Sequence, residues 1–283
     1  METKKFLLVV FAAAIAAFLG LTDPSEPSGR VGGASIASTA AQQLPLAPDR
    51  VTPRPPVPLA DGLDLSISGL SARAILVKDP VSGYVLFEKK VQETLPIASL
   101  TKLMTAMVVN RRVQSEELVE ISWEDTQMAL ARHAGGSVEV FVTEMNKEAE
   151  RLGMEHTSFE NPVGFDAPNH YSTAADLSLL VEEFLRYPEL LEIVSTKSET
   201  VYSADRHVRH SLLTTNRLMM EYPQIVGLKT GYTAEAKGNL IILSDDPGHP
   251  GYEYFSIVLG SDNREAETSV IMNWVLNSFR WAP

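Results

Sequence analysis

Prolines confine the part of this chain that can fold to its C-terminal side. Eight of the 17 prolines lie at positions 22–59, and no aromatic residue occurs between Phe18 and Tyr84. Proline cannot donate a backbone hydrogen bond, and a stretch without large apolar side chains cannot nucleate a core. Residues 22–67 are therefore predicted to be a proline-rich, disordered linker, partly polyproline II, that tethers a folded domain at 68–283.

The N-terminal segment has the form of an export signal. Lys4 and Lys5 precede an uninterrupted apolar run at residues 6–21. A basic start followed by such a run is typical of a secretory signal, and the run is shorter than the ~20 residues that a membrane-spanning helix prefers. Residues 1–21 are predicted to be a signal peptide or an uncleaved signal anchor. We expect an exported protein, periplasmic or otherwise extracytoplasmic, that meets a membrane only through this segment.

The charge and the missing residue types exclude several function classes. The net charge is −12, from 24 basic and 36 acidic side chains, which argues against nucleic-acid binding and against an electrostatic hold on anionic lipid. The chain has no cysteine, which removes disulfide scaffolds, thiolate metal sites and cysteine nucleophiles. It also has no His-Glu-x-x-His pattern, no G-x-S-x-G elbow and no phosphate-binding glycine loop. Zinc hydrolysis therefore has no support in the sequence.

The domain at 68–283 begins and ends with predicted hairpins. Alternating apolar residues and turn signals predict strands at 72–77, 84–87, 239–244 and 254–259. Apolar periodicity predicts helices at 100–109, 138–152, 174–185 and 270–279, with Gly153 as the stop of the second. This order of elements predicts an α+β fold with an antiparallel sheet flanked by helices.

Ser99 stands where the apolar helix at 100–109 begins, and Lys102 follows on the same helix face. Taken alone, the pair is better explained as a helix N-cap and a solvated charge. The helix has almost no polar face, however, so Lys102 should be buried near the positive end of the helix dipole. Both effects favour the neutral amine, which can take the proton of a serine hydroxyl and make it nucleophilic.

A second cation would lower the pKa of Lys102 further. Lowering it by ~3 units costs roughly 4 kcal/mol, which burial and a nearby positive charge can supply. The candidate is Lys229, in an extended stretch at 226–233, where Gly231 would let a ligand approach the backbone. The alternative explanation is an edge-strand lysine beside a turn glycine.

Together, the serine–x–x–lysine and lysine–threonine–glycine patterns resemble those of the serine D-Ala-D-Ala carboxypeptidases, the low-molecular-weight penicillin-binding proteins of the peptidase S11 type. These enzymes are fold relatives of the class A β-lactamases. Further segments resemble sequences of this family and occur in the same order along the chain: residues 161–165, 168–177, 193–197 and 216–218. The likeness covers about 72–281, and it implies a β-lactamase/transpeptidase-like fold for a penicillin-binding D,D-peptidase domain at 68–283.

The resemblance also implies roles for particular residues. Ser99 would attack the carbonyl between the two D-alanines of a peptidoglycan stem peptide and form an acyl-enzyme, with Lys102 as general base. The substrate-binding residues would be Lys229, Thr230, Gly231 and Tyr232. The first two would hold the terminal carboxylate, and the backbone N–H groups of Ser99 and Tyr232 would form the oxyanion hole. β-Lactams would be covalent inhibitors. No metal and no organic cofactor are implied, and His170 would be structural.

The sequence departs from the family at its third motif, serine–x–asparagine. Only residues 123–127 separate a strand-like segment at 118–122 from a helix-like segment at 128–133, so the helical subdomain that carries the motif is predicted to be truncated. Ser122 could be aligned with the motif serine, but Glu124 would then replace an amide by a negative charge. Loss of a positioned proton donor costs ~10²–10⁴ in rate, so the activity would be impaired.

The leading hypothesis is a serine D,D-carboxypeptidase that removes the terminal D-alanine from stem peptides in cell-wall biosynthesis. A D,D-endopeptidase acting on cross-links is the first alternative, because it would use the same residues. A non-catalytic homologue that still binds wall peptides is the second, because the third motif is missing. A damaged or mis-assembled reading frame around Ser122 would also explain the gap.

Overall fold

The computed structural model of the protein describes residues 54–59, 69–112, 126–202, 209–246 and 249–281. Three sequence-based expectations fall outside these ranges: the export segment, most of the proline-rich linker, and the segment around Ser122. Of the turn predicted between the last two strands, only residues 247–248 lie outside, and the other residues belong to the strands Lys237–Asp246 and His249–Ser261, which are longer than predicted. In the part of the chain that is described, no helix is long and apolar enough to cross a membrane.

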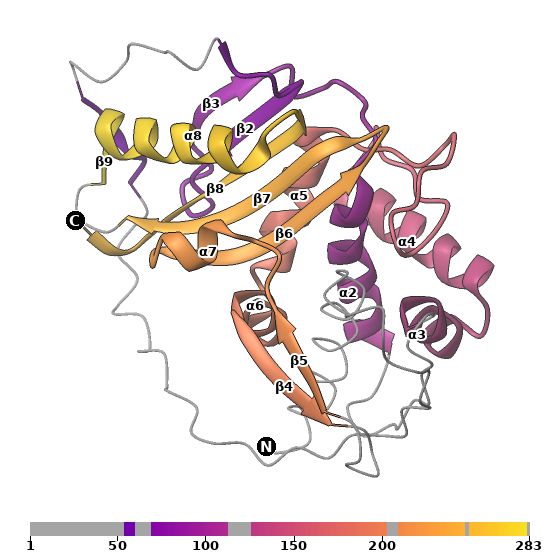
Figure 1. Ribbon diagram of the computed structural model, residues 1–283. Helices are drawn as coiled ribbons and strands as arrows, with labels where there is room; N and C mark the ends of the chain where they lie inside the picture. Colours follow the sequence, from indigo (N-terminus) through magenta and orange to yellow (C-terminus); the bar gives the residue numbers. More distant parts are fainter. Residues whose placement is uncertain (1–53, 60–68, 113–125, 203–208, 247–248, 282–283) are drawn as a thin grey trace.

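A five-stranded antiparallel sheet forms the centre of the fold (Figure 1). Its strands, in spatial order, are β3 (Val85–Lys89), β2 (Ala74–Lys78), β8 (His249–Ser261), β7 (Lys237–Asp246) and β6 (Ile225–Thr233). The two predicted hairpins are confirmed, as the pairs β2–β3 and β7–β8. They join into one sheet because β2 also pairs with β8, with Ile75 opposite Val258.

Alternate residues of the central strands face two separate cores. On β7, Leu240 and Ile242 belong to one core, whereas Ile241 and Leu243 belong to the other. This alternation follows from the two-residue period of a strand, and it requires cover on both faces of the sheet. The α+β class with an antiparallel sheet flanked by helices is confirmed.

Helices cover both faces of the sheet (Figure 1). One face is covered by α8 (Arg264–Ser278), whose Ile271 and Val275 pack into the core on that side. The opposite face carries α2 (Thr101–Arg112), α4 (Val138–Leu152) and α5 (Ala174–Phe184). The remaining elements are η2 (Ala98–Leu100), α3 (Thr126–Gly135), α6 (Pro188–Ser195), β4 (Ser198–Tyr202), β5 (Arg209–Leu213) and α7 (Leu218–Glu221).

The bounds of α4 are those that the sequence predicts, because both of its ends are capped. The Ser137 hydroxyl accepts a hydrogen bond from the Val140 N–H at 3.2 Å. Gly153 ends the helix in the left-handed conformation, with φ of +78°, which costs glycine nothing. Local chemistry alone therefore sets the start and the end of this helix.

The C-terminal helix is longer than predicted. The apolar pattern indicates 270–279, but α8 begins at Arg264, where the side chain of Asn263 accepts a hydrogen bond from the Ala266 N–H. Glu265 and Glu267 in the first turn suit the positive end of the helix dipole. The apolar pattern marked only the most buried part of the helix and missed its polar first turns.

A short strand pair lies outside the central sheet and differs from the expected linker. β1 (Val57–Pro58) falls within the range predicted to be disordered, yet it pairs with β9 (Phe279–Arg280). The Leu59 N–H also donates to the Ser278 carbonyl at 2.7 Å. Proline is tolerated here because such a strand needs few backbone donors.

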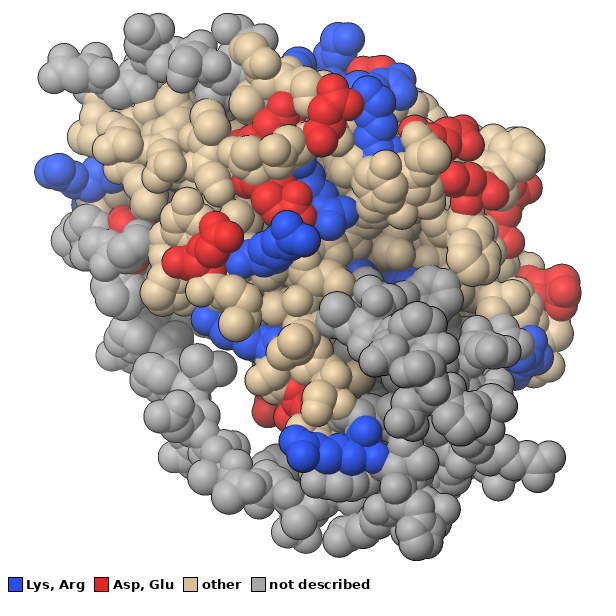
Figure 2. Space-filling view, viewed as in Figure 1, with Lys and Arg blue, Asp and Glu red and all other residues tan. Residues whose placement is uncertain are grey.

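Charges of both signs are mixed on the face shown in Figure 2. Lysine and arginine side chains lie next to aspartate and glutamate side chains, and the described residues on this face form no continuous basic surface. This mixture of signs is what a chain with 24 basic and 36 acidic side chains would present.

Candidate active site

Ser99 lies in the turn η2, immediately before the buried helix α2. Its side chain is half-buried, and no side chain caps this turn, whose N-cap position is Ile97. The capping explanation of Ser99 therefore has no support. Ala98, just before it, has a φ of +47°, a left-handed conformation that is unfavourable for any residue with a Cβ atom.

Lys102 is buried in the first turn of α2, with 1% of its surface exposed. Burial, and then the positive charge of Lys229, lower the pKa of Lys102 from 10.5 to about 6. The predicted burial and the predicted effect of a second lysine are confirmed. At neutral pH the Lys102 amine is mostly unprotonated and can accept a proton.

Lys229 is also buried, on the edge strand β6. Its ammonium group donates to the Thr230 carbonyl at 2.8 Å. Burial, and then the charge of Arg264, lower the pKa of Lys229 to about 7. Lys229 does lie on an edge strand, as the alternative explanation proposed, but its side chain is buried and does not lie in solvent.

Strand β6 runs directly against the turn that carries Ser99. A Cβ atom added at Gly231 would lie 3.0 Å from the Ile97 carbonyl oxygen and 3.1 Å from the Ser99 nitrogen. Thr230 is buried, and Tyr232 has 70% of its surface exposed. The structure thus brings together two segments that are far apart in the sequence, the Ser99–Lys102 turn and the Lys229–Gly231 strand.

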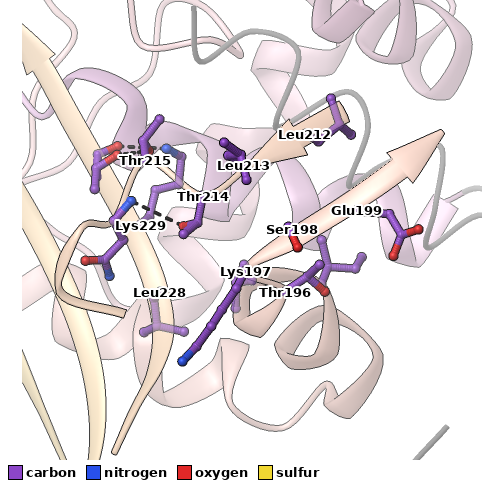
Figure 3. Close-up of a pocket in the computed structure, with 14 residues that line it drawn as sticks. Thr196, Lys197, Ser198, Glu199, Leu212, Leu213, Thr214, Thr215, Leu228 and Lys229 are labelled. Atoms are coloured by element: carbon purple, nitrogen blue, oxygen red, sulfur yellow. Dashed lines mark hydrogen bonds between the residues drawn. The ribbon is translucent and has the colours of Figure 1, made fainter. Parts of the chain in front are cut away.

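A pocket opens beside Lys229 and Thr230 (Figure 3). It lies between β6 and the segment formed by α6, β4 and β5, with Thr215 and Lys229 at one end and Glu199 and Leu212 at the other. The hydroxyl oxygens of Thr215 and Thr230 are 2.8 Å apart. Hydroxyl donors beside a buried cation can hold a carboxylate. Sequence reasoning did not identify Thr215, because one threonine in a polar stretch carries no local signal.

The loop formed by residues 159–170 packs against the turn that carries Ser99. The sequence analysis did not predict this contact. The Asn161 side chain accepts hydrogen bonds from the N–H groups of Gly164 and Phe165. Gly164 has a φ of +88°, and a Cβ atom there would lie 2.0 Å from the Ala98 carbonyl oxygen. On its other side the loop reaches β6, where the Thr233 hydroxyl donates to Asp166 at 2.7 Å. An asparagine followed three positions later by glycine is a turn signal that could have indicated this loop.

Gly164→Ala is expected to disrupt the turn at Ser99. The added methyl group overlaps the Ala98 carbonyl, so the turn must move, and displacement of a nucleophile by about 1 Å costs on the order of 10² in rate. We expect at least that loss in the rate of acylation by a labelled penicillin, together with a lower melting temperature.

The matched control is Gly136→Ala. Gly136 has a similar φ of +80°, but a Cβ atom there would meet nothing within 4 Å. It should lose stability through backbone strain and keep its acylation rate. Equal acylation rates in the two variants would contradict a role for Gly164 at the site.

Metal binding has no candidate in the part of the chain that the structure describes. No group of three or more histidine, aspartate or glutamate side chains there is placed to hold an ion. Ser122, the residue that could be aligned with the third motif, lies outside the described residues together with its neighbours. The described site therefore consists of the segments around Ser99, Gly164 and Lys229.

The family model for D-alanyl-D-alanine carboxypeptidases, peptidase S11, matches the chain in two pieces, residues 64–125 and 117–263. D-alanyl-D-alanine carboxypeptidase DacF of Bacillus subtilis is 27% identical over 79% of this chain and 67% of its own length. DacA of Haemophilus influenzae is 27% identical over 74% of this chain and 63% of its own length. A D-alanyl-D-alanine endopeptidase of Pseudomonas aeruginosa is 32% identical over 62% of this chain and 67% of its own length. The chain thus spans about two thirds of these relatives.

Solved structures agree with the sequence comparison. Penicillin-binding protein 5 from Haemophilus influenzae superimposes with a TM-score of 0.63 at 25% identity, covering 72% of this chain and 70% of that one. Penicillin-binding protein D2 from Listeria monocytogenes, in its ampicillin-bound form, gives 0.61 at 28% identity, covering 72% and 97%. The Streptomyces K15 DD-transpeptidase gives 0.63 at 23% identity, with the same coverage, and supports the fold.

Proposed function

Because the chain belongs to the peptidase S11 family of D-alanyl-D-alanine carboxypeptidases, we propose that it is an exported serine D,D-carboxypeptidase. It would remove the terminal D-alanine from peptidoglycan stem peptides through an acyl-enzyme on Ser99. In this proposal residues 1–21 direct export or anchor the chain, 22–67 form the tether, and 68–283 form the catalytic domain. β-Lactams would acylate the same serine.

The observation that carries the proposal is the buried amine of Lys102, one helical turn after Ser99. With its pKa lowered to about 6, Lys102 can accept the proton of the Ser99 hydroxyl as the oxygen attacks the carbonyl between the two D-alanines. The C–N bond then breaks as the proton taken up by Lys102 passes to its nitrogen, D-alanine leaves as the free amine, and the acyl group stays on Ser99. Attack by water on this ester releases the shortened peptide and restores the serine.

The backbone next to Ser99 would stabilise the negative charge that forms on the carbonyl oxygen. The N–H groups of Ser99 and Tyr232 are the proposed donors, and each such donor contributes ~3–4 kcal/mol in known hydrolases. Support comes from the close approach of β6 to the turn, since only 3.1 Å would separate a Cβ at Gly231 from the Ser99 nitrogen.

Lys229 and Thr230 would hold the free carboxylate of the substrate. A charged Lys229 supplies the attraction, and the hydroxyl of Thr230, paired with that of Thr215, supplies a directed hydrogen bond. This anchor would recognise the free carboxylate of the residue that leaves. The pocket beside these residues leaves space for the end of the peptide.

D,D-endopeptidase activity on cross-links is the second candidate. It is favoured by the likeness to the Pseudomonas aeruginosa endopeptidase, which is 32% identical to this chain over the matched residues. The acylation step would be the same, but the leaving group would be the amine of a neighbouring stem peptide. No residue of the proposed site separates the two activities.

The missing third motif supports a third candidate, a wall-peptide-binding homologue without turnover. The two pieces of the family match overlap at residues 117–125. We infer that the segment that would carry serine–x–asparagine is absent there, because only residues 123–127 separate the flanking segments. In the enzyme proposal the short segment weakens the donation of a proton to the leaving amine, which would make turnover slow. Resequencing the gene around codon 122 would test whether the short segment is genuine.

Release of D-alanine from a stem pentapeptide tests the proposal. We expect the purified protein to release one D-alanine per peptide and to lose this activity after incubation with penicillin, because both compounds compete for Ser99. A cross-linked dimer is the parallel substrate, and faster cleavage of the dimer would favour the endopeptidase. If the folded protein binds the pentapeptide but cleaves neither substrate, the non-catalytic homologue is the remaining explanation.

A further inference from the structure

The carbonyl of Ala98 is held by a side chain from the following helix. The Thr101 hydroxyl donates to this carbonyl oxygen at 2.8 Å, and both residues are buried. Ala98 needs such a restraint because its φ of +47° is unfavourable for alanine. The conformation of Ala98 sets the direction in which the chain enters Ser99.

His170 continues this contact away from Ser99. Its Nε2 atom lies 2.7 Å from the Thr101 hydroxyl oxygen, and its Nδ1 atom accepts a hydrogen bond from the Glu160 N–H at 3.1 Å. Since Nδ1 is an acceptor and the Thr101 proton points to Ala98, Nε2 must carry the proton that it donates to Thr101. Burial lowers the pKa of His170 to about 4, against the opposing effect of Glu160 and Asp166, so the ring is neutral at neutral pH.

The loop that carries His170 is fixed at its base and at its tip. Ser158 and Tyr171 exchange two backbone hydrogen bonds, each of 3.0 Å. The Thr105 hydroxyl, one turn beyond Thr101, donates to the Pro162 carbonyl at 2.6 Å. Gly164 covers the same Ala98 carbonyl that Thr101 binds. His170 is therefore held against Thr101 by contacts that do not depend on a ligand.

We propose that His170 and Thr101 are positioning residues for the nucleophile. The hydrogen-bonded chain from His170 Nε2 through the Thr101 hydroxyl to the Ala98 carbonyl holds the left-handed turn and fixes the Ser99 hydroxyl and N–H group against β6. The proposal rests on the proposed function, because it assigns the two residues to the acylation step on Ser99. It gives His170 a role in the reaction rate beyond the structural one expected from the sequence.

The test compares variants that keep or remove the Thr101 hydroxyl. Thr101→Val has almost the same shape but cannot bond Ala98 or His170, and acylation by a labelled penicillin should slow ~10- to 100-fold. The binding constant before the covalent step should stay unchanged, because neither residue reaches the carboxylate site. Thr101→Ser should recover most of the rate. His170→Gln, which keeps an N–H near the Nε2 position, should be slowed less than His170→Leu.

Ser178→Ala is the matched control for the loss of a buried hydroxyl. The Ser178 hydroxyl donates to the Ala175 carbonyl, three residues back, as Thr101 does to Ala98, but it lies on α5 outside the site. It should lose stability without losing acylation rate. A Thr101→Val protein that reacts as fast as Ser178→Ala would overturn the inference, as would a Thr101→Ser protein as slow as Thr101→Val.

A measurement that does not need catalysis separates this inference from the proposed function. The Leu100 N–H donates to the Ile97 carbonyl at 3.2 Å across this turn. Hydrogen exchange at the Leu100 amide should be faster in Thr101→Val than in the unaltered protein, because the turn is released. If the unaltered protein forms no adduct, the proposed function fails. The exchange rate then still decides whether the hydrogen bonds from His170 through Thr101 to Ala98 hold the turn. Unchanged exchange at the Leu100 amide would overturn the inference in either case.

Discussion

Ser99→Ala is expected to abolish the covalent adduct with a labelled penicillin, the largest effect that we predict for any single change. The alanine has no oxygen to form the ester with the acyl group of the penicillin. The measurement is intact mass after incubation, where the unaltered protein gains the mass of one penicillin and the variant gains none.

A suitable control is Ser269→Ala, which removes a half-buried serine on α8 whose hydroxyl donates to the Glu265 carbonyl. This variant should form the adduct at the normal rate. The fold of Ser99→Ala is expected to persist, since only a half-buried hydroxyl is lost, and its melting temperature checks this. An adduct that remains in Ser99→Ala would place the nucleophile elsewhere.

Lys102→Met should slow acylation by about 10²–10⁴, the usual contribution of a general base. Methionine has a similar length and keeps α2 packed, so the loss reports on the amine and not on a cavity. The acylation rate of the unaltered protein should rise with pH through about 6, where Lys102 loses its proton, and the variant should lack this rise. Above about 7 the rate should fall, because Lys229 loses the charge that attracts the carboxylate.

The same substitution is expected to stabilise the fold. The pKa of Lys102 falls from 10.5 in the unfolded chain to about 6 in the folded one, so folding releases a proton between these pH values. The unfolded state then binds more protons, and stability rises with pH across this range. At pH 7 the buried amine lowers the free energy of unfolding by up to about 5 kcal/mol. Methionine carries no such cost, because it does not bind a proton. Slower acylation together with a higher melting temperature would show that the Lys102 amine serves the reaction and destabilises the fold. A lower melting temperature would contradict the statement that burial of this amine costs stability.

Much of the local structure could be predicted from the sequence. The helix α4 has the bounds that its apolar period and Gly153 predict. The strands β2, β3, β7 and β8 lie where alternating residues and turn signals predict them. These features depend on interactions between residues a few positions apart, and such interactions are the same in any fold. Ser99 and Lys102 were identified for the same reason, because one helical turn relates them.

The sequence alone could not give the contacts between distant segments. The placing of β6 against the Ser99 turn depends on the pairing of β2 with β8, which joins the two ends of the domain in one sheet. The left-handed turn at Ala98 has no local signal, since it is held by Thr101 and covered by Gly164. The contact of His170 with Thr101 likewise requires the 159–170 loop to be in place.

The sequence by itself thus determined which side chains are proposed to carry the chemistry, how the elements alternate, and where the helix α4 begins and ends. The sequence also predicted the burial of Lys102 and the effect of Lys229 on its pKa. The tertiary structure added that Lys229 is itself buried and that its pKa falls as well. The physical reason is that a pKa depends on everything that surrounds the group. Removal of water from the two lysines requires the sheet, α2 and the surrounding core to close around them, and a short stretch of sequence indicates this only for Lys102, through its apolar helix.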